Sequence, residues 1–262
     1  SFRYIEFFGA PGVGKSTLYM NLISNNNQLW MDSNNAKTLC MRKVVLKRYS
    51  GLKVPLLKIG FSIPFLSKLL HKSAASLIDK TLIDNFLSKH KGFFEHANSR
   101  ILSSNSSESR KVTASMMLLN SIKDYSLFNM IGGDISILFD ESFAQRVYTQ
   151  LSEFDNIDES NIVKKYLTKI PCPNGLVYMQ ANSDQIMERI LKRYDETGQI
   201  NYMHKNLSKQ KLLARCDKYR RYAKLGVEVL ANRGVPILAI NSSNLKENIS
   251  LVRKFIENQY ES

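Results

Sequence analysis

The sequence predicts an α/β fold in which a parallel sheet of about five strands is covered by helices on both faces. Short apolar runs alternate with longer amphipathic segments, an order that is typical of a parallel sheet. The first apolar run leads directly into a glycine-rich loop and then into a helical pattern. Residues 36–130 interrupt this alternation, because they show helical spacing and lack strand signals.

Five short segments have the composition of strands, and most of them are followed by a polar residue or a glycine. The strands are predicted at 3–8, 29–31, 135–139, 175–180 and 236–240. Helices are predicted at 15–24, 140–151, 184–193 and 245–258. Parallel sheets bind ligands at the carboxyl ends of their strands, and the residues at these ends are Gly9, Asp32, Asp140 and Asn182.

Residues 36–130 are predicted to form a large helical insertion within a single domain that spans residues 1–262. Apolar residues recur there at helical spacing, as in Leu77, Ile78 and Leu82, and the serine-rich stretch 103–109 is expected to be a loop. A chain of 262 residues can bury one sizeable core, and it fits one domain with an insertion better than two independent domains. The insertion is expected to bind a substrate or a partner.

The composition is strongly basic, with 37 Lys and Arg residues against 23 Asp and Glu residues and a formal net charge of +14. Such a chain attracts anions, among them nucleotides, phosphorylated substrates, nucleic acid and acidic membrane faces. No recognised nucleic-acid module is evident, so nucleic acid is not the expected partner. The cysteines and histidines show no metal-ligand spacing, and the three widely spaced cysteines favour a reducing cytoplasm.

The most apolar stretch, residues 54–70, is interrupted by two prolines and two lysines. It is therefore too short and too polar to cross a bilayer. A packed or partner-facing helix is preferred here, and peripheral contact with an anionic membrane at its inner face stays open.

Residues 9–17 read G-A-P-G-V-G-K-S-T and match the pattern G-x-x-x-x-G-K-[ST] in full. The match lies between a predicted strand and a predicted helix, which is the context that a phosphate-binding P-loop requires. The glycines let the backbone curl, so that its N–H groups and the helix N-terminus form an anion cradle. The alternative is a chance glycine-rich turn, which the spacing and the flanking segments disfavour.

The P-loop predicts binding of a nucleoside triphosphate, most simply ATP with Mg²⁺. The residues expected to contact the nucleotide are Gly9, Pro11, Gly12, Val13, Gly14, Lys15, Ser16 and Thr17. Lys15 is expected to reach the β- and γ-phosphates, Ser16 to bind Mg²⁺, and Thr17 to hydrogen-bond the α-phosphate.

Asp140 and Glu141 follow a predicted apolar strand. A carboxylate beside a P-loop can hold Mg²⁺ through water, and Asp also caps helices well, so both roles are predicted for Asp140. Glu141 is expected to point into the acceptor site. Arg146 has two open roles: it anchors an acceptor anion, or it pairs with an acidic side chain.

Residues 189–221 are predicted to form a lid-like segment. Arg189 and Arg193 are four residues apart on one helix face, a polar stretch follows, and Arg215, Arg220 and Arg221 come next. Arginines that close over transferring phosphates neutralise the charge of the transition state. The alternative is an ordinary solvated basic helix.

The order of these segments resembles the P-loop nucleotide kinases, thymidylate kinases especially. The resemblance covers roughly residues 3–24 and 135–258, including I-L-F-D-E-S-F-A-Q-R and V-Y-M-Q-A-N-S-D-Q-I-M-E-R-I-L-K-R. It implies a P-loop NTPase three-layer sandwich with strand order 2-3-1-4-5. It also implies phosphate, metal and lid roles for Lys15, Ser16, Asp140, Arg189 and Arg193, with Arg189 contacting the nucleotide.

The sequence departs from these kinases where the acceptor should bind. Thymidylate kinases have an Arg directly after the strand-end Asp, where this chain has Glu141, and the acidic-proline-glycine segment after the second strand is missing. Gly198 is followed by Gln199, without the Gly-Arg and the Asp pair of adenylate-type lids. A hydroxyl acceptor benefits from a carboxylate base, whereas a phosphate acceptor needs none.

The sequence therefore predicts an ATP-dependent phosphotransferase, a small-molecule or glycan kinase with Glu141 or Asp32 as the base. Its acceptor is expected to be anionic or extended, and a hydroxyl is preferred. One alternative is a nucleoside monophosphate kinase. The other is a regulatory ATPase or switch whose helical insertion binds a partner. A GTPase switch is disfavoured, since the chain has no N-K-x-D segment. The sequence assigns no oligomeric state.

Overall fold

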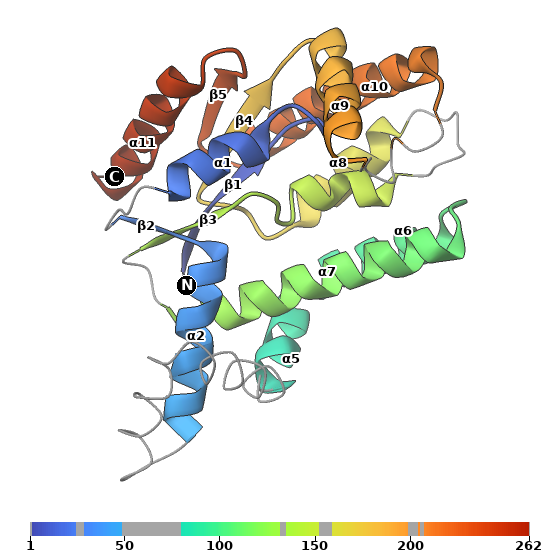
Figure 1. Cartoon of the computed structure of the whole chain (residues 1–262). Helices are drawn as coiled ribbons and strands as arrows, with labels where there is room; N and C mark the ends of the chain where they lie inside the picture. The colour runs from blue at the N-terminus through green and yellow to red at the C-terminus, as the bar shows by residue number, and fades with distance from the viewer. Residues whose placement is uncertain are drawn as a thin grey trace.

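The computed structural model describes residues 2–24, 29–48, 80–131, 135–151, 159–198, 204 and 207–261. The apolar stretch 54–70 and Gln199 lie outside the described residues. The described helices and strands alternate at both ends of the chain, as predicted (Figure 1). In chain order they are β1 (Arg3–Phe8), α1 (Lys15–Ile23), β2 (Trp30–Asp32), α2 (Ser33–Arg48), α5 (Lys80–Lys89), α6 (Lys91–Ser103), α7 (Glu108–Phe128), β3 (Ser136–Phe139), the 3-10 helix η1 (Gln145–Gln150), α8 (Ser160–Lys169), β4 (Gly175–Gln180), α9 (Ser183–Thr197), α10 (Lys209–Ala231), β5 (Ile237–Asn241) and α11 (Leu245–Glu261).

The five strands form one sheet in the order β2-β3-β1-β4-β5, and every neighbouring pair is parallel. The predicted fold class and strand order are confirmed. This order places β3 directly beside β1, with Glu6 opposite Phe139. The residues that follow the two strands, Gly9 and Asp140, therefore meet at the same edge of the sheet.

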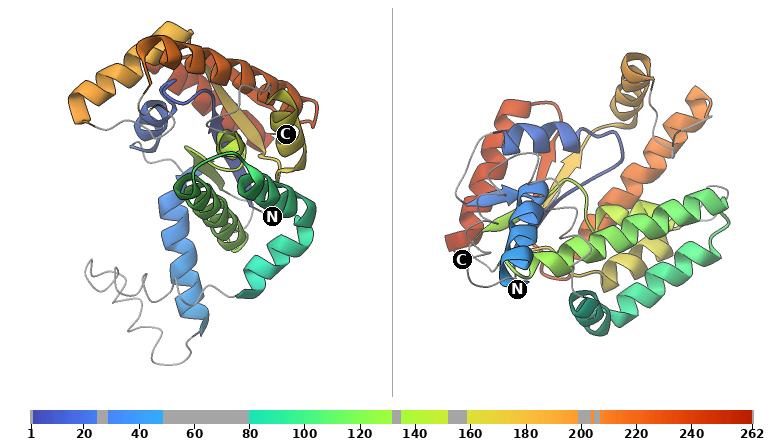
Figure 2. Two further views of the ribbon diagram at one scale, coloured as in Figure 1. Left: turned by 90° about the vertical axis from the view of Figure 1, so that its right-hand side faces the viewer. Right: turned by 60° about the horizontal axis from the view of Figure 1, so that its bottom comes forward.

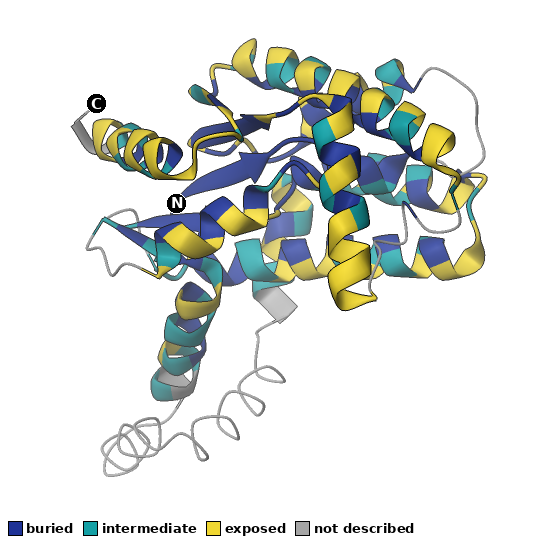
Figure 3. Ribbon diagram, turned by 45° about the horizontal axis from the view of Figure 1, so that its top comes forward, coloured by how far each residue is buried: buried dark blue, intermediate teal, exposed yellow. Residues whose placement is uncertain are grey.

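The central strand β1 is buried from Tyr4 to Phe8 because helices cover both faces of the sheet. Side chains alternate along a strand, so Phe7 and Phe8 point to opposite faces. Phe7 contacts Tyr19 of α1, with ring centroids 5.8 Å apart, and Phe8 stacks on Tyr148 of η1 at 6.3 Å. The strands β1, β3 and β4 accordingly form the dark, buried centre of Figure 3, and the helices around them have a buried side and an exposed side.

Two helices pack very closely on opposite faces of the sheet. On one face, Phe255 of α11 lies against Gly175 of β4. On the other, Gly226 of α10 faces the Phe8 ring, and a Cβ atom at this position would lie 2.8 Å from Leu167 and 2.9 Å from Phe8. Because real Cβ atoms do not approach so closely, glycine at position 226 lets α10 lie against the sheet.

The described helices of the predicted insertion lie on one side of the molecule, and α9, α10 and α11 lie on the other (Figures 1 and 2). The helix α2 starts at Ser33 and so runs across the bound at residue 36 that was predicted for the insertion. Phe86, Phe93 and Leu118 belong to the same buried cluster as the strand residues. The loop expected at 103–109 is shorter in the structure, because α6 ends at Ser103 and α7 begins at Glu108. The Ser107 hydroxyl accepts a hydrogen bond from the N–H of Arg110.

The predicted helix at 140–151 is wrong. Residues 140–144 form bends and turns, and only the 3-10 helix η1 follows them. The physical reason is the buried carboxylate of Glu6, which accepts hydrogen bonds from the N–H groups of Ser142, Ala144 and Gln145. These N–H groups are thereby satisfied from a distant strand, so the segment has no need of an α-helical start. Asp140 accordingly does not cap a helix here.

No helix in the described part of the chain is long and apolar enough to cross a membrane. The helix α8 was not anticipated from the sequence. Its buried residues Val163, Tyr166 and Leu167 have the spacing of one helix face, which is the signal that could have identified it.

Candidate functional site

The P-loop joins the end of β1 to the start of α1, as the motif predicts. Gly12 and Gly14 have φ angles of 88° and 106°, in a region that L side chains rarely adopt. Gly14 is also the N-cap of α1, so the loop turns directly into the helix N-terminus. These glycines allow the tight curl that an anion-binding loop requires.

Lys15 is buried against the loop that it follows. Its Nζ donates to the carbonyl oxygens of Gly9 at 3.2 Å and Ala10 at 3.4 Å. Burial lowers the pKa of Lys15, and the nearby carboxylates of Glu141 and Asp140 act in the opposite direction. An anion in the loop would stabilise this buried ammonium further.

Ser16 and Asp140 meet at the edge of the sheet, where the Ser16 hydroxyl donates to Asp140 Oδ2 at 2.6 Å. The other carboxylate oxygen, Oδ1, is buried and has no hydrogen-bond partner among the described residues. Burial raises the pKa of Asp140, while the Ser16 hydroxyl and Lys15 lower it.

This donor set fits Mg²⁺. Within the described ranges, no group of three or more His, Cys, Asp or Glu side chains could hold a metal ion. Mg²⁺ does not need such a group, because it is commonly held by one or two carboxylates, a hydroxyl, nucleotide phosphates and water. The unpartnered oxygen of Asp140 beside Ser16 is the kind of ligand that Mg²⁺ prefers.

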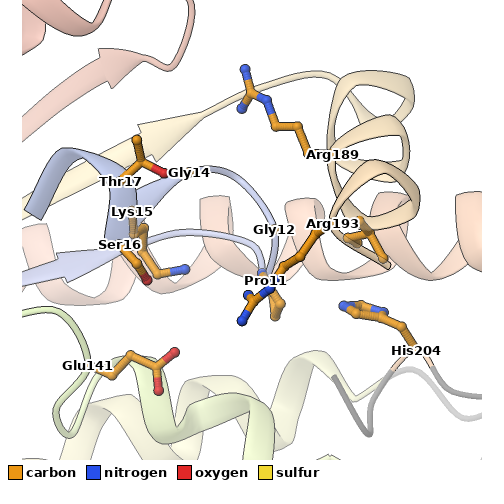
Figure 4. Close-up of a pocket in the computed structure, with 11 residues that line it drawn as sticks. Pro11, Gly12, Gly14, Lys15, Ser16, Thr17, Glu141, Arg189, Arg193 and His204 are labelled. Atoms are coloured by element: carbon orange, nitrogen blue, oxygen red, sulfur yellow. The ribbon is translucent and has the colours of Figure 1, made fainter. Parts of the chain in front are cut away.

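A cavity of about 290 Å³ lies over the P-loop (Figure 4). Loop residues form one wall, and Glu141, Arg193 and His204 contribute side chains from other segments. Figure 4 shows Lys15, Arg193 and Glu141 pointing into the space between the loop and the segment that carries Glu141. The Arg193 side chain makes no hydrogen bond or ion pair with another described residue, so its charge is available to a ligand.

Arg189 also lines this cavity, but its guanidinium group holds the protein backbone. Its Nη1 donates to the Val13 carbonyl at 2.6 Å and to the Ser242 hydroxyl at 2.8 Å. Figure 4 shows Arg189 and Glu141 on opposite sides of the loop. Arg189 thus ties the P-loop to the segment between β5 and α11.

Glu141 forms an ion pair with Arg146, at 2.8 Å between Oε2 and Nη1. Of the two predicted roles of Arg146, the structure thus shows the pairing with an acid. Asp32 is the last residue of β2, directly before α2, and is not among the residues that line the cavity. Its Oδ1 accepts hydrogen bonds from the N–H groups of Asn34 and Asn35 at 3.0 and 3.1 Å.

The predicted lid-like segment is divided between helices. Arg189 and Arg193 lie on α9, whereas Arg215, Arg220 and Arg221 lie on α10 and do not line the cavity. The polar stretch between these helices is described only in part.

The sequence did not identify Glu6 and Gln145 as parts of the site. Glu6 Oε1 accepts from Ser142 and Gln145 at 2.8 Å each, and Oε2 accepts from Ala144 at 3.0 Å. The Gln145 side chain in turn accepts a hydrogen bond from the N–H of Gly9 at 3.3 Å. Glu6 therefore connects the acidic segment after β3 to the P-loop. The sequence did contain one signal for this role, because Glu6 is the single acidic residue in a largely apolar predicted strand.

His204 is the third residue that the sequence missed. It lines the cavity, is only 2% exposed, and neither ring nitrogen has a hydrogen-bond partner within the described residues. Burial, together with the positive charge of Arg215, lowers the pKa of His204 to about 4. It is therefore a neutral imidazole at neutral pH.

Replacing Glu6 with glutamine is expected to destabilise the protein by an amount that depends on pH. Burial raises the pKa of Glu6 from 4.5 to about 7, although three backbone N–H groups act against this shift. Between these values the folded protein retains a proton that the unfolded chain has lost. The stability contributed by this group is thus present below pH 4.5 and is lost, by on the order of 3 kcal/mol, as the pH rises through 7.

The free energy of unfolding of both proteins is measured by urea denaturation at pH 5 and pH 8. Every other titratable group is present in both proteins. Its contribution therefore cancels when the free energy of unfolding of the variant is subtracted from that of the wild type. The wild type should exceed Glu6→Gln in free energy of unfolding by more at pH 5 than at pH 8. An equal difference in free energy of unfolding at the two pH values would contradict the prediction.

Replacing Asp140 with asparagine is expected to weaken Mg²⁺-dependent turnover about 10- to 100-fold. The amide keeps the shape of the carboxylate but lacks the charge that binds the metal. Nucleotide binding measured in EDTA should change little, and the Mg²⁺ concentration for half-maximal activity should rise. Asp184→Asn, an exposed first-turn position on α9, is the matched control. A loss of activity that merely follows a loss of thermal stability would argue against a metal role.

Comparisons with models of known protein families and with curated proteins found no match to this chain. The functional proposal therefore rests on the P-loop sequence and on the geometry of the cavity.

Proposed function

We propose that the chain is an ATP- and Mg²⁺-dependent phosphotransferase that transfers the γ-phosphate to an acceptor bound beside Glu141. The observation that carries the proposal is the contact between Ser16 and Asp140 at the mouth of the P-loop, with one Asp140 oxygen left unpartnered. A complete phosphate loop beside such a carboxylate is the arrangement that phosphoryl transfer uses.

The protein residues would act mainly by position and charge. The loop N–H groups and Lys15 would hold the β- and γ-phosphates, and Ser16 and Asp140 would hold Mg²⁺. Bound Mg²⁺ would supply positive charge against the triphosphate. Arg193, whose side chain points into the cavity, would neutralise charge that develops on the transferring group.

A hydroxyl acceptor, such as that of a small molecule or glycan, is the preferred substrate. Glu141 would take the proton of the hydroxyl as the new phosphorus–oxygen bond forms and ADP leaves. Glu141 lines the cavity, and its ion pair with Arg146 holds the carboxylate in one direction at the cavity wall.

A second candidate is a nucleoside monophosphate kinase, and the same ion pair favours it. Glu141 alone would repel an acceptor phosphate, but Arg146 at 2.8 Å offsets its negative charge. Arg193 would add a further cation on the same cavity.

An acceptor screen with γ-labelled ATP tests these candidates. Label on a hydroxyl compound supports the first, and label on nucleoside monophosphates supports the second. Release of free phosphate alone, with no labelled acceptor, would instead favour a regulatory ATPase or switch. Absence of both ATP binding and turnover would overturn the proposal.

A further inference from the structure

A second cavity lies between the carboxyl end of β4 and the middle of α10. Its volume is about 280 Å³, and it is lined by Tyr178, Gln180, Ala181, Arg220, Arg221 and Lys224. It shares no lining residue with the cavity over the P-loop. The proposed phosphotransfer makes no use of these side chains.

The cations of this cavity come from one helix and are poorly neutralised. Arg220 contacts Asp217 at a distance of 3.5 Å, and both side chains are about half exposed. Arg221 and Lys224 are exposed and have no acidic partner in the part of the chain that the structure describes. Three neighbouring positive charges on a cavity wall repel one another, and an anion between them would remove this repulsion.

Tyr178 adds an aromatic ring and a hydroxyl group to the lining of the same cavity. The residue is only 7% exposed, with its ring 6.4 Å from that of Phe8, and its hydroxyl has no hydrogen-bond partner among the described residues. Burial raises the pKa of Tyr178, Arg220 acts against this shift and the negative charge of Glu228 adds to it, so the hydroxyl remains a proton donor at neutral pH. Gln180, at the end of β4, contributes an amide group that can also donate.

We propose that this cavity is a second anion site that binds the phosphate group of a small phosphorylated molecule. Two guanidinium groups, an ammonium, a phenol and an amide offer more donors than one carboxylate can accept. A phosphate monoester or pyrophosphate has enough oxygens, and guanidinium groups bind phosphate oxygens in pairs. Because the site lies outside the P-loop cavity, it does not depend on the proposed phosphotransfer.

Calorimetric titration of the full chain with pyrophosphate in the absence of metal tests the inference. The wild type should show two classes of site. Lys15→Ala should weaken the one at the P-loop, and the double variant Arg221→Ala/Lys224→Ala should weaken the other at least about ten-fold. Tyr178→Phe removes only the hydroxyl and should weaken the second site several-fold, about three- to ten-fold, without affecting the first.

The matched control is Lys209→Ala/Lys211→Ala, which removes the same charge from exposed positions of α10 outside the cavity. It should retain both classes of site. A single class of site in the wild type, or an equal loss in the control, would overturn the inference while leaving the phosphotransferase proposal intact. Malonate binding as tight as that of pyrophosphate would overturn the assignment to phosphate.

Discussion

Replacing Lys15 with alanine is expected to abolish turnover of the triphosphate, with a loss of about 100- to 1,000-fold or more. The Lys15 ammonium is buried beside the loop and reaches only the carbonyl oxygens of Gly9 and Ala10. Its charge is therefore placed to stabilise phosphates bound in the loop. Steady-state kinetics and ATP titration of the purified variant measure the loss.

The matched control for this variant is Lys164→Ala, which removes the same charge from an exposed position on α8. It should keep the affinity and the rate of the wild type. Circular dichroism and thermal unfolding establish that both variants are folded. Unchanged ATP affinity and turnover in folded Lys15→Ala would remove the basis for a nucleotide site at this loop.

Replacing Glu141 with glutamine is expected to slow phosphoryl transfer about 10²- to 10⁴-fold if the acceptor is a hydroxyl. Glutamine keeps the shape of the side chain but cannot accept the acceptor's proton. ATP affinity should stay nearly unchanged, because Glu141 lines the cavity opposite the loop. Single-turnover transfer to an acceptor found in the screen measures the chemical step directly.

The ion pair with Arg146 provides the comparison that separates a base from a structural contact. Arg146→Gln breaks the same pair but leaves the Glu141 carboxylate in place, so its rate loss should be clearly smaller. Equal losses in the two variants would show that the pair matters only for structure. If Glu141→Gln instead improves the binding of a nucleoside monophosphate and keeps its rate, the second candidate is correct.

The fold class and the P-loop could be predicted from the sequence because both depend on short stretches of chain. The motif of residues 9–17 specifies its own conformation through glycines at 12 and 14 and through the helix that follows. Apolar runs such as Arg3–Phe8 and Gly175–Gln180 identify strands by composition alone. The parallel order then brings the ends of β1 and β3 together, as the contact of Ser16 with Asp140 confirms.

The conformation after Asp140 could not be predicted in this way. The helical pattern of residues 140–151 arises from neighbouring residues only. Glu6, however, accepts hydrogen bonds from three N–H groups of this segment and lies 136 to 139 residues away from them in the chain. The same limit applies to Arg189, whose partners Val13 and Ser242 come from distant segments. No neighbouring residue in the sequence indicates that the Arg189 guanidinium donates a hydrogen bond to the backbone carbonyl of Val13.

The sequence by itself therefore determined the five strands, the place of the phosphate loop and the meeting of the ends of β1 and β3. Only the tertiary structure decided the partners of Glu6 and Arg189, which are the segment after Asp140 for Glu6 and Val13 with Ser242 for Arg189. The physical reason is the distance along the chain over which each property is determined. Backbone conformation and hydrophobic periodicity are encoded over a few residues, whereas a buried charge is stabilised by whichever groups the completed packing brings within a few ångströms of it.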